Sequence, residues 1–397
     1  MKRDKAILLM AAGQIVTWAG LYYVFPALLL RWEQELGWTK AELTAAITLA
    51  VFLSALSAPL AGRLIDRGLG PQWMTGCTLA GSAALFLCSL SQHIWQFYVL
   101  WAVIGISLSG ALYEPCSSMV TRARGSRAKQ GIILITLIAG FAGAISFPFA
   151  YSLAEAFGWR MALKVFAAVV AVVGAPIIWT AARLLEADAH DTARSETQDH
   201  RPADGFLVNP IFWTLGIAFS LLAVLHGVTP HHLRSIHDDR RVKSAVAVLA
   251  ASFIGPMQVA GRLVMVAVEK HVSHHGIAAS TFVLMGFSIL LLMAAGTVPT
   301  LLVIFVILFG GSYGIVSIIR PVIARDLLGQ SGFGAKSGGL ALLYLCGSAS
   351  APFLGALIWE LGGYGLVLPL LVGVALSGLI LYLAANRLAS SQVGRAP

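Results

Sequence analysis

Long apolar runs recur along the whole chain and limit the folds that are open to it. Windows of roughly 18 or more apolar residues follow one another, and each is long enough to cross a bilayer as a helix. Of the 397 residues, 58% are hydrophobic and only 11% are charged, whereas a soluble protein of this size covers its surface with charge. We therefore expect an all-α polytopic membrane protein.

The pattern predicts twelve transmembrane helices in two pseudo-symmetric six-helix bundles. The predicted spans are 6–30, 41–62, 73–91, 95–121, 129–152, 161–183, 210–230, 244–268, 275–296, 298–324, 336–358 and 364–386. The first span is too long for a signal-peptide core and has no clear cleavage site, so we interpret it as a retained anchor. Residues 184–209 are the only long polar stretch, and they predict a flexible linker between an N-terminal bundle (1–183) and a C-terminal bundle (210–397).

The basic residues predict the orientation of the chain. About two thirds of the 27 Lys and Arg residues fall in one alternating set of loops, which also contains both termini and the linker. Because cytoplasmic loops carry this excess, we expect a multi-pass protein of the plasma membrane, the inner membrane of a bacterium, with both termini in the cytoplasm. The net charge of +9 follows from the same bias, so no nucleic-acid partner is predicted.

The sequence gives no sign of enzymatic or cofactor chemistry. The four cysteines lie in apolar spans without paired spacing, and we interpret them as packing residues; they are Cys77, Cys88, Cys116 and Cys346. Three histidines share one predicted loop, and a solvated loop is favoured over a metal site there; they are His271, His274 and His275. No nucleophile–base pair and no phosphate-binding loop stands out. We predict no enzyme activity, no cofactor, no metal and no coupling to ATP.

An internal repeat relates the two halves of the chain. Residues 105–158 align with residues 310–363 when insertions of one to three residues are allowed, and Glu114-Pro115 then falls on Arg320-Pro321. The alignment relates span 4 to span 10 and span 5 to span 11. Two parallel six-helix halves are expected from such a repeat.

These features resemble the major facilitator superfamily, whose best-known signature is a Gly-x-x-x-Asp-Arg loop between spans 2 and 3. Here the loop reads "GRLIDRGLGP" from Gly62, with Asp66 and Arg67 in the signature positions. The resemblance implies that these two residues help to hold the halves together on the cytoplasmic side while the cavity opens outward. Shorter motifs resemble the monocarboxylate and oxalate/formate branch: "GWTKAEL" (37–43), "FGWR" (157–160) and the Gly-Arg pair at 261–262.

One departure bears on the choice of branch. Drug/proton antiporters of this superfamily usually carry an arginine in span 4, four residues before a glycine, and this chain has Trp101 ahead of Gly105. The resemblance to the drug-efflux branch is therefore weaker, although it stays open.

Polar side chains inside the spans mark the candidate substrate site. A charge without a partner at the bilayer centre costs at least about 2.5–3.5 kcal/mol, so its presence points to function. The candidates fall on three helical faces: Arg262 with Gln258, Arg320 with Tyr313, and the span-1 stripe Gln14, Trp18 and Tyr22. An arginine fork matches a carboxylate, and these groups are predicted to bind a small organic anion with an apolar body. The alternatives are that Arg262 braces a loop and that the stripe is interhelical packing.

Glu114 is the predicted coupling residue. It lies inside span 4, and the repeat places it opposite Arg320 of span 10, which predicts that the two side chains pair and that the pair takes part in coupling or gating. The alternatives are a permanent structural ion pair and a local hydrogen bond of Glu114 within its own half.

We therefore predict a secondary active transporter of small organic anions, foremost monocarboxylates, that works by alternating access as a monomer in the lipid bilayer. Protons or a counter-anion would be its coupling partner. Two alternatives stay open: a proton-driven exporter of drugs or metabolites, and a non-transporting membrane sensor.

Overall fold

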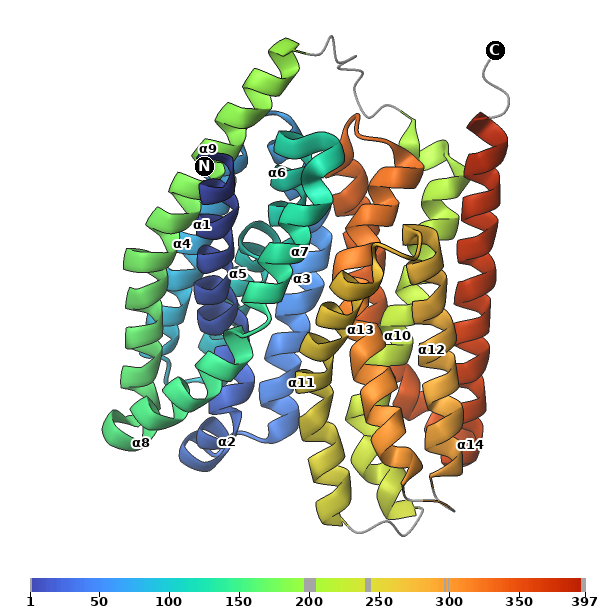
Figure 1. The fold of residues 1–397 in the computed structure, drawn as a ribbon. Helices are drawn as coiled ribbons and strands as arrows, with labels where there is room; N and C mark the ends of the chain where they lie inside the picture. Colours follow the sequence, from blue (N-terminus) through green and yellow to red (C-terminus); the bar gives the residue numbers. More distant parts are fainter. Residues whose placement is uncertain (1, 196–204, 240–243, 296–297, 299, 394–397) are drawn as a thin grey trace. The chain divides into compact units, whose positions relative to one another are not determined.

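The computed structural model of the protein describes residues 2–195, 205–239, 244–295, 298 and 300–393. The regular secondary structure in this part of the chain is helical (Figure 1). The chain divides into two compact units, Met1–Asp204 with Gln330–Leu342, and Gly205–Gly329 with Leu343–Pro397. The segment Gln330–Leu342 therefore clusters with the first unit, although the sequence places it in the C-terminal half.

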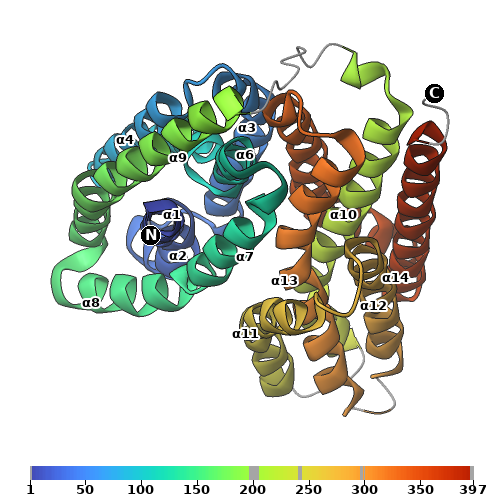
Figure 2. The ribbon, with the colours of Figure 1, turned by 45° about the horizontal axis from the view of Figure 1, so that its top comes forward.

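The first unit contains the spans that were predicted for the N-terminal bundle, together with the start of α14 (Phe333–Val393). Its elements are α1 (Lys2–Thr17), the π-helical η1 (Trp18–Tyr23), α2 (Val24–Leu36), α3 (Lys40–Asp66), α4 (Gly70–Cys88), α5 (Ile94–Ala111), α6 (Tyr113–Arg124), the 3₁₀ turn η2 (Gly125–Arg127), α7 (Ala128–Ala139), α8 (Ala142–Val169), the π-helical η3 (Val170–Gly174) and α9 (Ala175–Ser195). Within this unit α9 packs against α1 and α4 (Figures 1 and 2). Helix α5 packs against α3 and α4.

Local sequence signals set several of these boundaries. A capping box begins α3, because the Thr39 side chain accepts from the backbone N–H of Glu42 while the Glu42 carboxylate accepts from that of Thr39. Gly37 ends α2 in the left-handed conformation, with φ 68°. Gly158, with φ 79°, interrupts α8, and this break separates the predicted spans 5 and 6.

Aromatic rings fill the core of the first unit at one end. Trp32 contacts Phe25, Phe97, Trp101 and Trp159, with ring centroids 5.1–6.3 Å apart. These five side chains are at most 2% exposed. Trp101, which occupies the position of the antiporter arginine, is therefore a core residue.

The second unit consists of η4 (Phe206–Val208), α10 (Pro210–Asp239), α11 (Ser244–Val268), α12 (His274–Ala294), α13 (Leu301–Leu328) and most of α14 (Phe333–Val393). Gly362 and Gly363 interrupt α14 between the predicted spans 11 and 12, and Gly363 has φ 60°. Phe219, Phe282 and Tyr382 form a ring cluster in its core.

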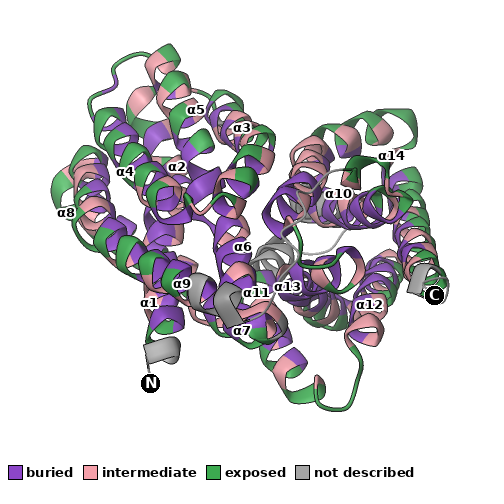
Figure 3. Cartoon of the chain, turned by 90° about the horizontal axis from the view of Figure 1, so that it is seen from above, coloured by how far each residue is buried: buried purple, intermediate pink, exposed green. Residues whose placement is uncertain are grey.

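The surfaces of both units fit a lipid environment. Large apolar side chains lie exposed on the peripheral helices, for example Val172 (73%), Phe353 (70%) and Ile380 (66%). Exposed positions follow the outward faces of helices such as α8 and α14 (Figure 3). The described residues include eight helices that are long and apolar enough to cross a membrane, and the predicted fold class, an all-α polytopic membrane protein, is confirmed.

The predicted linker 184–209 differs from the expectation at its start. Helix α9 continues to Ser195, because two acidic side chains on it pair with arginines near the end of α6. The pairs are Arg122–Glu186 (2.9 Å) and Arg124–Asp188 (2.8 Å). Residues 196–204 of the predicted linker lie outside the described residues, and the domain boundaries stay predictions.

Candidate functional site

Span 4 is broken where it passes span 1. Helix α5 ends at Ala111, Leu112 is extended (φ −102°, ψ −154°), and α6 begins at Tyr113. The carbonyl of Ala111 would accept from the N–H of residue 115 in a continuous helix, but Pro115 has no N–H. The amide of Gln14 takes its place, with Nε2 donating to the Ala111 carbonyl at 2.9 Å. A side chain of span 1 thus provides the hydrogen bond that the Ala111 carbonyl lacks at the break in span 4.

The predicted span-1 stripe lies beside this break. Span 1 is π-helical over Trp18–Tyr23, and π-bulges are frequent at functional sites. The Trp18 ring contacts the Tyr113 ring at 4.5 Å and the Tyr22 ring at 5.1 Å, while Tyr22 contacts Tyr23 at 5.4 Å. These four rings are half-buried, whereas Gln14 is fully buried. We call Trp18, Tyr22, Tyr23 and Tyr113 the span-1 ring cluster.

Glu114 follows the break directly. It lies half-buried in the first turn of α6, where the helix dipole favours a negative charge. Its backbone carbonyl accepts from the Ser118 hydroxyl at 3.1 Å. The pairing of Glu114 with Arg320 stays a prediction.

The signature loop makes a more extensive contact than the sequence indicated. The Asp66 carboxylate accepts from two backbone N–H groups at the start of α14, those of Gly334 (2.9 Å) and Ala335 (2.8 Å). The backbones are so close here that a side chain on Gly62 or Gly334 would overlap the opposite carbonyl. Arg67 is exposed, and it is Arg122 that reaches this loop, donating to the Asp66 carbonyl at 2.7 Å and to Glu186.

In the second unit, Arg320 of α13 is buried against aromatic rings. Its side chain lies over the Tyr344 ring, 4.1 Å from the centroid, and the residue is 8% exposed. The Tyr344 hydroxyl donates to the hydroxyl of Tyr313 at 3.2 Å, and the Tyr313 ring stacks on that of His226 with an interplanar angle of 5°. We call Arg320, Tyr344, Tyr313 and His226 the arginine–aromatic cluster. A buried guanidinium beside flat rings can bind an anion that carries an apolar body.

Arg262 and Gln258 lie at the tight crossing of α11 and α13. Arg262 is 7% exposed, and its Nε donates to the Gly314 carbonyl at 3.3 Å. Side chains on Gly261 or Gly314 would overlap the opposite backbone at Gly311 or Gln258. Through its hydrogen bond to Gly314, Arg262 joins α11 to α13 within the unit. Its contact with substrate stays a prediction.

Sequence reasoning missed Tyr344, Tyr113, Arg122 and Glu186. Tyr344 and Tyr113 lie on other spans than the arginine and the stripe that they contact, so helical spacing could not connect them. Glu186 lay in a stretch that was interpreted as linker. The only available signal was the spacing of Glu186 and Asp188, which matches that of Arg122 and Arg124.

The remaining titratable groups do not form a metal site among the described residues. His274 bonds Asp326 at 2.9 Å through Nδ1, and His275 bonds the Tyr382 hydroxyl at 2.9 Å. All four cysteines are free thiols, and three of them are buried.

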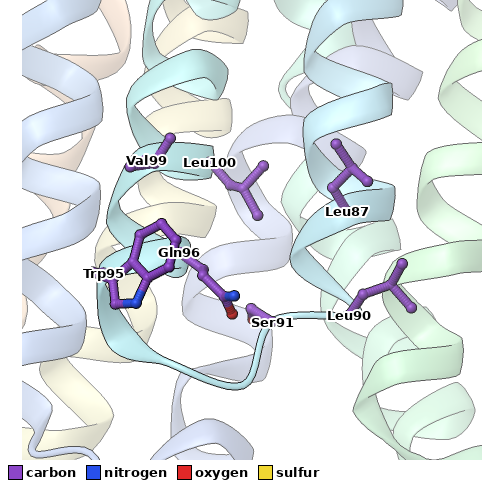
Figure 4. A pocket seen from close by; sticks show the side chains of 7 residues that line it. All are labelled: Leu87, Leu90, Ser91, Trp95, Gln96, Val99 and Leu100. Carbon is purple, nitrogen blue, oxygen red and sulfur yellow. The ribbon is translucent and has the colours of Figure 1, made fainter.

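A groove of about 260 Å³ lies between α4 and α5 in the first unit (Figure 4). Its lining is mostly apolar and consists of Leu87, Leu90, Ser91, Trp95, Gln96, Val99 and Leu100. Trp95 is 62% exposed, which fits a surface that lipid covers. None of the lining residues is charged, and we do not include the groove in the candidate site.

The described part of the chain has the fold of a polytopic membrane protein built from helical bundles. The family model described as "Major Facilitator Superfamily" matches residues 10–335. The chain therefore belongs to the major facilitator superfamily. The predicted superfamily is confirmed, and the predicted monocarboxylate and oxalate/formate branch is not.

Individual relatives agree with this family. A 163-residue stretch is 30% identical to the multidrug resistance protein MdtG of Escherichia coli O1:K1 / APEC, a match that covers 40% of this chain and 39% of that protein. The fold is similar to the human organic anion transporter MFSD10 (TETRAN), with a TM-score of 0.70, 15% identity and coverage of 96% of this chain and 99% of that one. It is also similar to a bacterial homologue of the iron transporter ferroportin in an outward-facing state, with a TM-score of 0.74, 14% identity and coverage of 96% and 98%.

Proposed function

We propose that the protein is a secondary active transporter of small organic anions, foremost monocarboxylates with an apolar body, coupled to protons. The observation that carries this proposal is the arginine–aromatic cluster. Arg320 brings a permanent positive charge into the interior of a membrane-spanning unit, where charges are expensive and therefore mark substrate pathways. The rings of Tyr344 and Tyr313 provide flat apolar surface next to that charge.

Within this proposal, the predicted site residues would have separate roles in recognition and coupling. Arg320 would bind the carboxylate, with Arg262 as a second candidate. The span-1 ring cluster would pack against the apolar body of the substrate. Glu114 would carry the coupling proton, since a carboxylate that moves between environments of different polarity exchanges a proton readily.

The signature loop would take part in the change of the transporter between its outward-open and inward-open states. The Asp66 carboxylate holds the first turn of α14 by two charge-assisted hydrogen bonds, and these must break if the start of α14 is to leave α3. We propose a bacterial inner-membrane location with both termini in the cytoplasm.

The match to MdtG favours a second candidate function, the export of drugs or metabolites. This candidate would use the same aromatic surfaces for larger apolar compounds and would not require a carboxylate on the substrate.

A transport assay separates the two candidates. Purified protein in proteoliposomes is tested with labelled lactate, benzoate, formate and oxalate, and with the lipophilic cation ethidium, each with and without an inward proton gradient. The first candidate predicts uptake of benzoate or lactate that the gradient accelerates, with no movement of ethidium. Ethidium transport without carboxylate uptake would reject it in favour of the exporter.

A further inference from the structure

The break in span 4 is held by a side chain of another helix, and this contact carries a further inference. Pro115 cannot donate to the Ala111 carbonyl, so the backbone alone would leave this buried acceptor without a hydrogen bond. Two span-1 side chains reach it, Gln14 through Nε2 at 2.9 Å and Thr17 through Oγ1 at 3.3 Å.

Gln14 is the principal donor of these two. The single proton of the Thr17 hydroxyl is shared with the Gly13 carbonyl, which is nearer at 3.1 Å. The other end of the Gln14 amide, Oε1, is buried and has no hydrogen-bond partner in the described part of the chain. The bond to Ala111 is therefore the hydrogen bond that fixes this amide.

The position of the break decides where the next residues lie. Tyr113 and Glu114 form the first turn of α6 directly after the extended Leu112, and the Tyr113 ring contacts Trp18 of the π-helical segment at 4.5 Å. In the aligned position of α13, Pro321 lies inside a helix that continues from Leu301 to Leu328. A proline in this sequence position is thus not sufficient for a break, and span 4 has in addition the contact from Gln14.

We infer that Gln14 is a positioning residue for substrate specificity: by holding the Ala111 carbonyl it keeps span 4 broken at Leu112 and keeps Tyr113 against Trp18. The inference deepens the proposed function, because it rests on the span-1 ring cluster as a surface for the apolar body of the substrate. It assigns Gln14 a function other than direct contact with substrate, in agreement with its complete burial.

A double-variant cycle tests this inference without any substrate. Gln14→Met removes the amide at similar volume, and Pro115→Ala supplies the backbone N–H that is missing opposite the Ala111 carbonyl. The chain is labelled with 5-fluorotryptophan, and the ¹⁹F resonance of Trp18, assigned with Trp18→Phe, reports its contact with the Tyr113 ring. The apparent Tm is measured in parallel.

Gln14→Met should lower the apparent Tm by roughly 2–4 °C and displace the Trp18 resonance. In the double variant the Tm should recover, because the new N–H bonds the carbonyl, while the Trp18 resonance stays displaced, because α5 and α6 can now join. Pro148→Ala, at an exposed proline inside α8, is the matched control. Combined with Gln14→Met, it should restore neither the Tm nor the Trp18 resonance.

Two results would overturn the inference. If the Trp18 resonance returns together with the Tm in the double variant, Gln14 only satisfies a carbonyl. If Gln14→Met leaves the resonance in place, Gln14 does not position Tyr113. Should Gln14→Met fail to fold, Gln14→Asn keeps the amide but is one methylene group too short, and the same displacement is expected. Failure of the proposed transport function would leave the outcome of this cycle unaffected.

Discussion

Asp66 is expected to act as a latch on the start of α14, and Asp66→Asn is the substitution that tests it. The carboxylate accepts from the N–H groups of Gly334 and Ala335, whereas an asparagine can accept from one of them and turns an NH₂ group towards the other. A hydrogen bond to a charged group contributes about 1.5–3 kcal/mol, and a negative charge at a helix N-terminus about 0.3–1 kcal/mol. The contact should therefore weaken by roughly 2–4 kcal/mol, which is roughly 30-fold or more in the opening equilibrium.

Hydrogen exchange of the latch amides measures this change directly. In lipid nanodiscs, Asp66→Asn should accelerate exchange in residues 333–336 by roughly 30-fold or more, while substrate affinity changes little. Glu42→Gln is the matched control, because that carboxylate caps its own helix α3 and should leave this segment unchanged. Unchanged exchange in 333–336 of folded Asp66→Asn would refute the latch, and an equal loss of affinity and transport rate would count against a gating function.

Three further predictions concern the spans. Arg262→Ala should abolish carboxylate uptake and Arg262→Lys should weaken binding by roughly tenfold, as measured by initial uptake rates; near-normal uptake by a well-expressed Arg262→Ala would show that the side chain only braces α11. Glu114→Gln should keep exchange of benzoate across the membrane but lose its acceleration by a proton gradient, and retained proton-driven accumulation would move the coupling to another residue. Gly261→Val should lower the apparent Tm by several degrees, because its side chain meets the Gly311 backbone; an unchanged Tm in a thermal-shift assay would contradict this packing.

The sequence predicted the helices well because their cause is local. Apolar length and the turn residues between spans are properties of short segments, so the order of the spans and most of their bounds followed from them, whereas the continuation of α9 to Ser195 did not. The breaks at Gly158 and Gly363 also lie close to predicted boundaries, since a glycine with positive φ is a local signal.

The candidate site was predicted less completely, because its contacts join residues that are distant along the chain. The position of the break in span 4 depends on Pro115, a local feature, together with Gln14, which lies 97 residues from its acceptor Ala111. Arg320 and Tyr344 are also in contact although they lie on different helices, α13 and α14. Composition misled at Glu186, where acidic residues that were taken for a solvated linker form ion pairs with α6.

Initial uptake rates of labelled benzoate in two matched variants test the central claim most directly. Arg320→Gln removes the buried charge beside Tyr344, and Arg325→Gln removes a charge from the same helix at its pair with Asp326. An arginine that binds the substrate carboxylate contributes about 1.5–3 kcal/mol, so Arg320→Gln should lower kcat/KM by roughly 10- to 100-fold, whereas Arg325→Gln should stay within about twofold of the unsubstituted protein. Equal rates for the two variants would contradict the proposal that Arg320 binds an anionic substrate.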